Sequence, residues 1–122
     1  MKDITSIDRG WIFLDCANTA ALTDANLGAA FAGLVRKAGF TVYEPIASKK
    51  FADAGGVTVS VIIGESSVDI HTWPEAGTAH IRLFYCHYSG NNDAKAERFF
   101  VLAKKYFKPK RACEVEKREF PV

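Results

Sequence analysis

The chain has 122 residues, of which 48% are hydrophobic and 25% charged, and its formal net charge is +2. This length supports one hydrophobic core, and the small charge gives no support for a nucleic-acid partner. No stretch holds the roughly 20 apolar residues that cross a bilayer, and the first residues lack a signal-peptide pattern. Three cysteines without a Cys-x-x-Cys pair are typical of a reducing compartment. We therefore expect one cytoplasmic domain over residues 1–122, with no membrane partner.

The hydrophobic pattern of the first third of the chain predicts a strand followed by a helix. Residues 11–16 are apolar and aromatic, as in a buried strand. Apolar side chains then recur at helical spacing over residues 27–38. Thr23 or Asp24 is the expected cap of this helix, and Gly39 is its expected stop.

The middle of the chain predicts a series of strands. Residues 41–45 read as a strand that ends at its proline, and residues 47–56 read as a loop. Strands are then expected over 57–63, 68–72 and 78–86, with a turn at Pro74 to Gly77 between the last two.

The final third predicts a helix and a last strand. Asp93 is the expected cap of this helix, and Pro109 bars its extension. Residues 111–120 alternate charged and apolar side chains and read as a strand. The expected buried face of the helix consists of Ala96, Phe99, Phe100, Ala103 and Phe107.

This order of elements predicts an α+β fold: a two-layer sandwich with a mainly antiparallel sheet and two helices on one face. Two helices cannot cover both faces of such a sheet. The open face must therefore meet solvent or another chain. Phe84 and Val59, which we place on that face, favour a partner chain, so we expect a homodimer.

One motif carries the strongest functional signal. The segment from Gly64 to Glu75, GESSVDIHTWPE, places a serine, a histidine and a carboxylate close together at the end of an apolar strand. It resembles the short bacterial and archaeal S-adenosylmethionine decarboxylases, whose pattern is a Glu-Ser pair followed at this offset by Ile-His-Thr-Trp-Pro-Glu. Cys86, twenty residues after Ser66, stands where that family has its catalytic cysteine.

The resemblance implies a proenzyme that cleaves itself. Ser66 would attack the carbonyl of Glu65, giving a beta chain of residues 1–65 and an alpha chain of residues 66–122. Ser66 would then become a pyruvoyl group, a carbonyl cofactor that takes up electrons no standard side chain accepts. His71 is the nearest candidate base for this processing.

The remaining site residues are also carried by the resemblance. The resemblance implies that Thr58 would donate from its hydroxyl to the oxyanion formed during cleavage. In turnover the substrate amine forms a Schiff base with the pyruvoyl carbonyl, and Cys86 returns a proton to the alpha carbon. Phe51 stacks on adenine and Glu75 accepts hydrogen bonds from the ribose, so the implied substrate is S-adenosylmethionine and the implied pathway is spermidine synthesis.

Two alternatives stay open. Ser67 stands where the family usually has histidine, and His87 where it usually has glycine. These departures leave room for a pyruvoyl decarboxylase of a basic amino acid such as ornithine or arginine. The other alternative is a regulatory paralogue that does not process itself, although Glu65, Ser66, His71 and Cys86 together argue against it.

A metal site is not expected. His80 and His87 are seven residues apart on one predicted strand, so their side chains point to opposite faces of the sheet. A site formed by these residues with His71 is therefore disfavoured.

Overall fold

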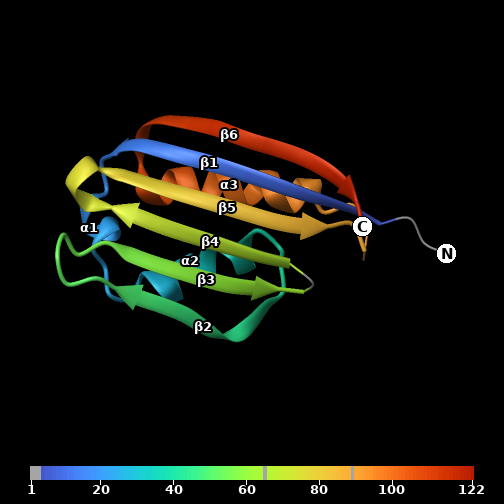
Figure 1. Ribbon diagram of the computed structural model, residues 1–122, viewed down its shortest axis with the longest axis horizontal. Helices are drawn as coiled ribbons and strands as arrows, with labels where there is room; N and C mark the ends of the chain where they lie inside the picture. The colour runs from blue at the N-terminus through green and yellow to red at the C-terminus, as the bar shows by residue number, and fades with distance from the viewer. Residues whose placement is uncertain (1–3, 65, 89) are drawn as a thin grey trace.

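The chain forms two layers over residues 4–64, 66–88 and 90–122, which are the residues that the computed structural model describes. A six-stranded antiparallel sheet makes one layer, and helices cover a single face of it (Figure 1). The predicted α+β sandwich is confirmed. The elements are β1 (Thr5–Cys16), α1 (Thr19–Leu22), α2 (Leu27–Lys37), β2 (Val42–Lys50), β3 (Val57–Ile63), β4 (Ser66–Trp73), the 3-10 turn η1 (Pro74–Ala76), β5 (Thr78–Cys86), α3 (Asp93–Phe107) and β6 (Pro109–Pro121).

The strand order is β2-β3-β4-β5-β1-β6. Strands β2 to β5 form a meander, and β1 lies between β5 and β6. Since neighbouring strands run in opposite directions, the start of β4 lies beside the end of β5. Over the described residues, no helix is long and apolar enough to cross a membrane.

The core lies between the sheet and the helices. Alternate residues of β3, namely Val57, Val59 and Val61, point toward the helices and are at most 1% exposed. Phe99 and Phe107 of α3 are fully buried against the same core. Burying a side chain of this size is worth about 1.5–3 kcal/mol, so this face holds the two layers together.

The open face of the sheet carries apolar side chains without a covering element. Ile62 is 55% exposed, and Phe84 and Trp73 are each 41% exposed. The prediction for Phe84 is therefore confirmed. The prediction for Val59 is wrong, because the period of two in β3 turns that residue toward the helices.

Several predicted boundaries are also wrong. Strand β2 continues through Pro45 to Lys50, so residues 47–50 are not loop. Proline is tolerated because β2 is an edge strand whose register with β3 shifts between Tyr43 and Ala47. In the N-terminal half, β1 begins six residues earlier than predicted, at Thr5.

The predicted helix caps need correction as well. Asn92 is the N-cap of α3, while Asp93 is the first helical residue. In α2 the N-cap is Asn26 rather than Thr23 or Asp24, although the Asp24 carboxylate accepts a hydrogen bond from the Asn26 N–H. Gly39 follows the end of α2 with a φ of 109°, as expected for a glycine stop.

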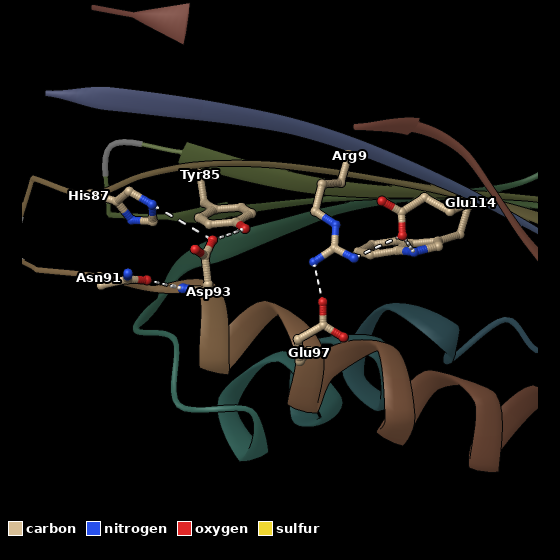
Figure 2. Close-up of polar contacts among 8 residues, drawn as sticks. Arg9, Tyr85, His87, Asn91, Asp93, Glu97 and Glu114 are labelled. Carbon is tan, nitrogen blue, oxygen red and sulfur yellow. Dashed lines mark hydrogen bonds and ion pairs between the residues drawn. The ribbon is translucent and has the colours of Figure 1, made fainter. Parts of the chain in front are cut away.

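One buried arginine ties α3 to the sheet. Arg9 is 4% exposed, and its guanidinium donates to Glu97 on α3 at 2.7 Å and to Glu114 on β6 at 2.9 Å (Figure 2). Burial alone would lower the pKa of Arg9, but the hydrogen bonds and charges of the two carboxylates raise it. Removing one partner of such a group leaves an uncompensated charge, so these contacts specify how α3 docks.

Close backbone packing makes Gly56 a structural requirement. A Cβ at Gly56 would lie 2.7 Å from the carbonyl oxygen of Thr72, which is backbone and cannot move aside. The Thr72 hydroxyl accepts from the Val57 N–H at 2.8 Å and donates to the Leu22 carbonyl at 2.7 Å. These two hydrogen bonds keep the Thr72 backbone close to Gly56. A Cβ at Gly33 of α2, in contrast, would meet no atom within 4 Å.

We predict opposite effects for alanine at these two glycines. Gly56→Ala should destabilise the fold by about 1–3 kcal/mol through overpacking. Gly33→Ala should stabilise it by about 0.5–1 kcal/mol, because alanine is the better helix former. Urea denaturation in a Ser66→Ala background, where every molecule keeps one intact chain, measures both changes. Equal stabilities for the two variants would contradict the close approach at Gly56.

Candidate active site

Ser66 and Cys86 meet at one end of the sheet. Ser66 is the first residue of β4 and Cys86 the last of β5, and the serine hydroxyl lies 4.0 Å from the thiol sulfur. Gly64, two residues before Ser66, has a φ of 58°, a conformation that favours glycine. Glu65, the other residue of the predicted cleavage site, lies outside the described residues. The two residues predicted to carry the chemistry are thus brought together.

A cavity of about 250 Å³ opens beside this pair. Ser66 and Cys86 line it together with the aromatic rings of Phe40, Tyr43, Tyr85 and Tyr88 and the polar side chains of Asn92 and Lys95. Lys95 is the one charged side chain among the described lining residues. The cavity therefore combines flat apolar walls with a single cation.

His71 and Thr58 form a second pair on the open face of the sheet. They are directly opposite each other in β4 and β3, and the Thr58 Oγ1 lies 3.0 Å from the His71 Nδ1. His80 of β5 is the register partner of His71, and its ring lies 4.4 Å from that of Trp73 between centroids. Burial and the neighbouring His71 lower the pKa of His80.

The two pairs are not brought together within one chain. His71 is five residues along β4 from Ser66, which corresponds to about 16 Å at the rise of an extended strand. An odd separation also turns the two side chains to opposite faces of the sheet. His71 therefore does not lie near Ser66 of its own chain, although it was the nearest candidate base in the sequence.

The two predicted substrate residues lie at the same end of the sheet as His71. Phe51 follows β2 directly and is 50% exposed, and its N–H donates to the Gly56 carbonyl at 2.8 Å. Glu75 is exposed in η1, between β4 and β5. Figure 1 shows η1 and the β2–β3 connection at one end of the sheet, opposite the end where β5 finishes.

Contacts between the end of β5 and the start of α3 were missed by the sequence analysis. The Tyr85 hydroxyl donates to the Asp93 carboxylate at 2.6 Å (Figure 2), and burial together with this hydrogen bond raises the pKa of Tyr85. Asn92 donates from its side chain to the Cys86 carbonyl at 2.8 Å. The only sequence signal was the run of polar residues 91–93, which indicates a turn but not its partners.

The three histidines do not form one cluster, because only His71 and His80 are cross-strand neighbours. His80 packs on Trp73 at the open face, whereas the His87 Nε2 lies 3.7 Å from Asp93 on the helical side. Within residues 4–64, 66–88 and 90–122, no group of three or more His, Cys, Asp and Glu side chains is placed to hold a metal ion.

The fold matches a known structure. The crystal structure of the adenosylmethionine decarboxylase from Aquifex aeolicus superposes with a TM-score of 0.77, covering 98% of this chain and 91% of that one. The two sequences are 21% identical, so this likeness establishes a shared fold.

Sequence comparison gives the family. The family model described as S-adenosylmethionine decarboxylase matches residues 13–118. The chain belongs to the S-adenosylmethionine decarboxylase family.

Similar proteins named S-adenosylmethionine decarboxylase proenzyme come from archaea and bacteria. The one from Archaeoglobus fulgidus is 44% identical over 54 residues, 44% of this chain and 45% of the relative. The one from Thermotoga petrophila is 44% identical over 61 residues, 50% of this chain and 44% of the relative. The one from Pyrobaculum neutrophilum is 37% identical over 59 residues, 48% of this chain and 46% of the relative. The matched region therefore spans about half the length of each relative.

Proposed function

We propose that this protein is a self-processing, pyruvoyl-dependent decarboxylase of S-adenosylmethionine that supplies the aminopropyl donor for spermidine synthesis. The observation that carries the proposal is the Ser66 hydroxyl at 4.0 Å from the Cys86 thiol, beside a cavity, in a chain of this family. The relatives' names describe proenzymes, which agrees with a chain that must be cut before it acts.

Processing begins at the serine. The Ser66 Oγ attacks the carbonyl carbon of Glu65, the peptide C–N bond breaks, and an ester joins the two parts. Loss of the Ser66 alpha proton expels the Glu65 carboxylate, and hydrolysis of the remaining enamine releases ammonia. The products are a chain of residues 1–65 and a chain of residues 66–122 that begins with a pyruvoyl group.

The residues around position 66 suit this group. Ser66 is partly buried and lines the cavity, so a carbonyl formed there is accessible to a substrate while its chain stays anchored in β4. The pyruvoyl carbonyl supplies the electron sink that decarboxylation needs. The Cys86 thiol lies next to that position and is our candidate for the group that protonates the product carbon.

We further propose that a second copy of the chain completes the site. His71 and Thr58 lie about 16 Å along the sheet from Ser66, so a processing role for them requires a partner that brings them closer. The open face, with Ile62, Phe84 and Trp73 exposed, is the surface on which a partner sheet would pack.

A two-fold axis gives the required geometry. When the axis lies between two facing sheets and runs across the strands, it reverses the strand direction, so the His71 end of one sheet covers the Ser66 end of the other. Ser66 is the first residue of β4 and Cys86 the last of β5, so residues of a partner on the open face would reach Ser66 around this end of the sheet. The same operation carries Phe51 and Glu75 of one chain toward the pyruvoyl position of the other.

Within one chain, the described lining of the cavity offers no partner for the cationic side chain of a basic amino acid. Ornithine or arginine needs a carboxylate to meet its cationic side chain. The described lining residues offer no carboxylate, and their one charged group is the ammonium of Lys95. His87, one of the two departures that left this alternative open, does not line the cavity and contacts α3 instead.

The cellular setting is also a proposal. Cys16, Cys86 and Cys113 are free thiols, which suits a reducing compartment, and we place the protein in the cytoplasm. We propose a homodimer of cleaved protomers that acts on a small molecule, without a nucleic-acid or membrane partner.

Self-cleavage is the first prediction from this function. The purified protein should consist of residues 1–65 and 66–122, with the second fragment blocked to N-terminal sequencing. Ser66→Ala should leave the chain whole and inactive, because no hydroxyl is available for the attack. Intact-mass spectrometry measures both. A wild-type sample that keeps only the full-length chain would refute the enzymatic proposal and favour a regulatory paralogue.

Complementation between inactive chains tests the shared site. Ser66→Ala and His71→Ala should each stay largely uncleaved when expressed alone. Co-expressed with different tags, they should form mixed dimers in which the His71→Ala chain is cleaved, because its Ser66 meets the intact His71 of the other chain. Mass spectrometry of each tagged chain reads the result.

The control for complementation is the double variant Ser66→Ala, His71→Ala mixed with His71→Ala, in which no intact histidine is present. Cleavage absent from both mixtures, with dimers formed, would rule out delivery of His71 by the partner.

Substrate recognition gives a further prediction. Loss of a stacked aromatic costs about 1–3 kcal/mol, so Phe51→Ala should raise the KM for S-adenosylmethionine about tenfold. Phe120→Ala is the matched control, since Phe120 is 42% exposed on the edge strand β6. Release of carbon dioxide from S-adenosylmethionine, ornithine and arginine is the measurement. Reaction with the basic amino acids alone would exclude the adenosyl pocket.

A further inference from the structure

Tyr85 and Cys86 at the end of β5, and His87 directly after it, are each hydrogen-bonded or close to Asn92 or Asp93 at the start of α3. The Tyr85 hydroxyl donates to the Asp93 carboxylate at 2.6 Å, and the Asn92 side chain donates to the Cys86 carbonyl at 2.8 Å. The His87 Nδ1 accepts from the Asn92 backbone N–H at 3.1 Å. The His87 Nε2 faces Asp93 at 3.7 Å (Figure 2). We name this set of four contacts the β5–α3 clamp.

Asn92 has an unusual role for its position. An N-cap asparagine usually accepts a hydrogen bond from a backbone N–H in the first helical turn, which is worth about 1 kcal/mol. The Asn92 side chain makes no such bond within the described part of the chain. Its amide instead donates to Cys86, the residue whose thiol faces Ser66.

We propose that Asn92 is a positioning residue that holds the Cys86 thiol at the reacting end of the sheet. The inference rests on the proposed function, in which Cys86 protonates the product. Asn92 also lines the cavity, but its side-chain hydrogen bond is to the Cys86 carbonyl, so it acts on the thiol through the Cys86 backbone. Tyr85 and Asp93 anchor the preceding residue of the same strand end to the same helix start.

Thiol position matters because two carbons compete for the proton. Protonation of the substrate-derived carbon gives the decarboxylated amine and restores the pyruvoyl group. Protonation of the carbon at position 66 transfers the amine nitrogen to the chain, which leaves alanine at position 66 and releases the substrate portion as an aldehyde. Water hydrolyses the imine formed on this route. One carbon is oxidised and the other reduced, so no external oxidant or reductant is required. If the Cys86 backbone is held loosely, the thiol delivers its proton less selectively to the substrate-derived carbon rather than to the carbon at position 66.

The clamp also explains what His87 does in this chain. The Asn92 N–H donates to Nδ1, so the proton of the neutral ring is on Nε2, facing the Asp93 carboxylate. The ring thereby orients the backbone of Asn92, whose side chain holds Cys86. A glycine at position 87 lacks both contacts.

Substitution of Asn92 by serine separates positioning from capping. Serine is an equally good N-cap, so helix stability is kept, but its side chain is too short to replace the bond to the Cys86 carbonyl. Asn26→Ser is the matched control, because Asn26 is the N-cap of α2, also without a side-chain cap bond, and lines a groove between α2 and β2.

The first measurement does not depend on activity. In a Ser66→Ala background, the rate of alkylation of Cys86 by iodoacetamide is followed over a range of pH by peptide mapping, with Cys113 as the internal reference. Asn92→Ser should raise the Cys86 rate about fivefold, the factor that corresponds to a hydrogen bond of about 1 kcal/mol, with no change at Cys113. Asn26→Ser should match its parent.

The second measurement uses processed enzyme with Ser66 intact. Asn92→Ser should increase the fraction of alanine at position 66 formed per turnover about fivefold, read by N-terminal sequencing of the alpha chain, while Asn26→Ser stays at the wild-type level. Unchanged Cys86 alkylation in Asn92→Ser would overturn the proposal, as would changed alkylation with an unchanged alanine fraction. Changed alkylation in a protein that never forms the pyruvoyl group would support the clamp and refute the proposed function instead.

Discussion

The hydrogen-bonded register of β3, β4 and β5 determines where each candidate residue lies. Ser66 at the start of β4 lies beside Cys86 at the end of β5, while His71 is paired with Thr58 farther along β4, so the two functional pairs occupy opposite ends of the β3–β4–β5 meander. Because side chains alternate along a strand, a slip of one residue would exchange the buried and open faces of the whole set. The buried valines of β3 exclude such a slip, since it would turn them to the open face. Core packing and site geometry thus depend on the same pairing.

Helix α3 adds a second level of organisation. Its first turns supply Asp93 to Tyr85 and Glu97 to Arg9, while its apolar face packs on the sheet. Glu114 completes the environment of Arg9 from β6: burial would raise the pKa of Glu114, but the hydrogen bond and charge of Arg9 lower it. The contacts that dock α3 therefore also support the strand end that carries Cys86.

The sequence predicted what depends on period and motif, and it failed where tertiary contacts decide. Alternation in residues 57–63 predicted β3, and the Ser66 motif with Cys86 predicted a pair that the register then brought to 4.0 Å. The predicted cap of α3 was wrong because the Asp93 carboxylate accepts from the Tyr85 hydroxyl, a tertiary contact that the local sequence pattern does not indicate. The separation of His71 from Ser66 was missed because an extended strand rises by about 3.3 Å per residue, so residues that are close in the sequence lie far apart in space.

The order of the strands means that the two products of the proposed cut share one sheet. The segment before position 66 contains β1, β2 and β3, and the segment after it contains β4, β5 and β6. In the sheet these segments interleave, because β3 pairs with β4 and β1 lies between β5 and β6. Arg9 and Thr72 bind across the same division, to Glu97 and Leu22. A single chain cut there becomes an obligate two-chain complex that can part only by dismantling its sheet. Folding is unimolecular before the cut, whereas refolding of the two separated chains depends on their concentration. Once formed, the active complex therefore persists far more readily than it refolds after unfolding.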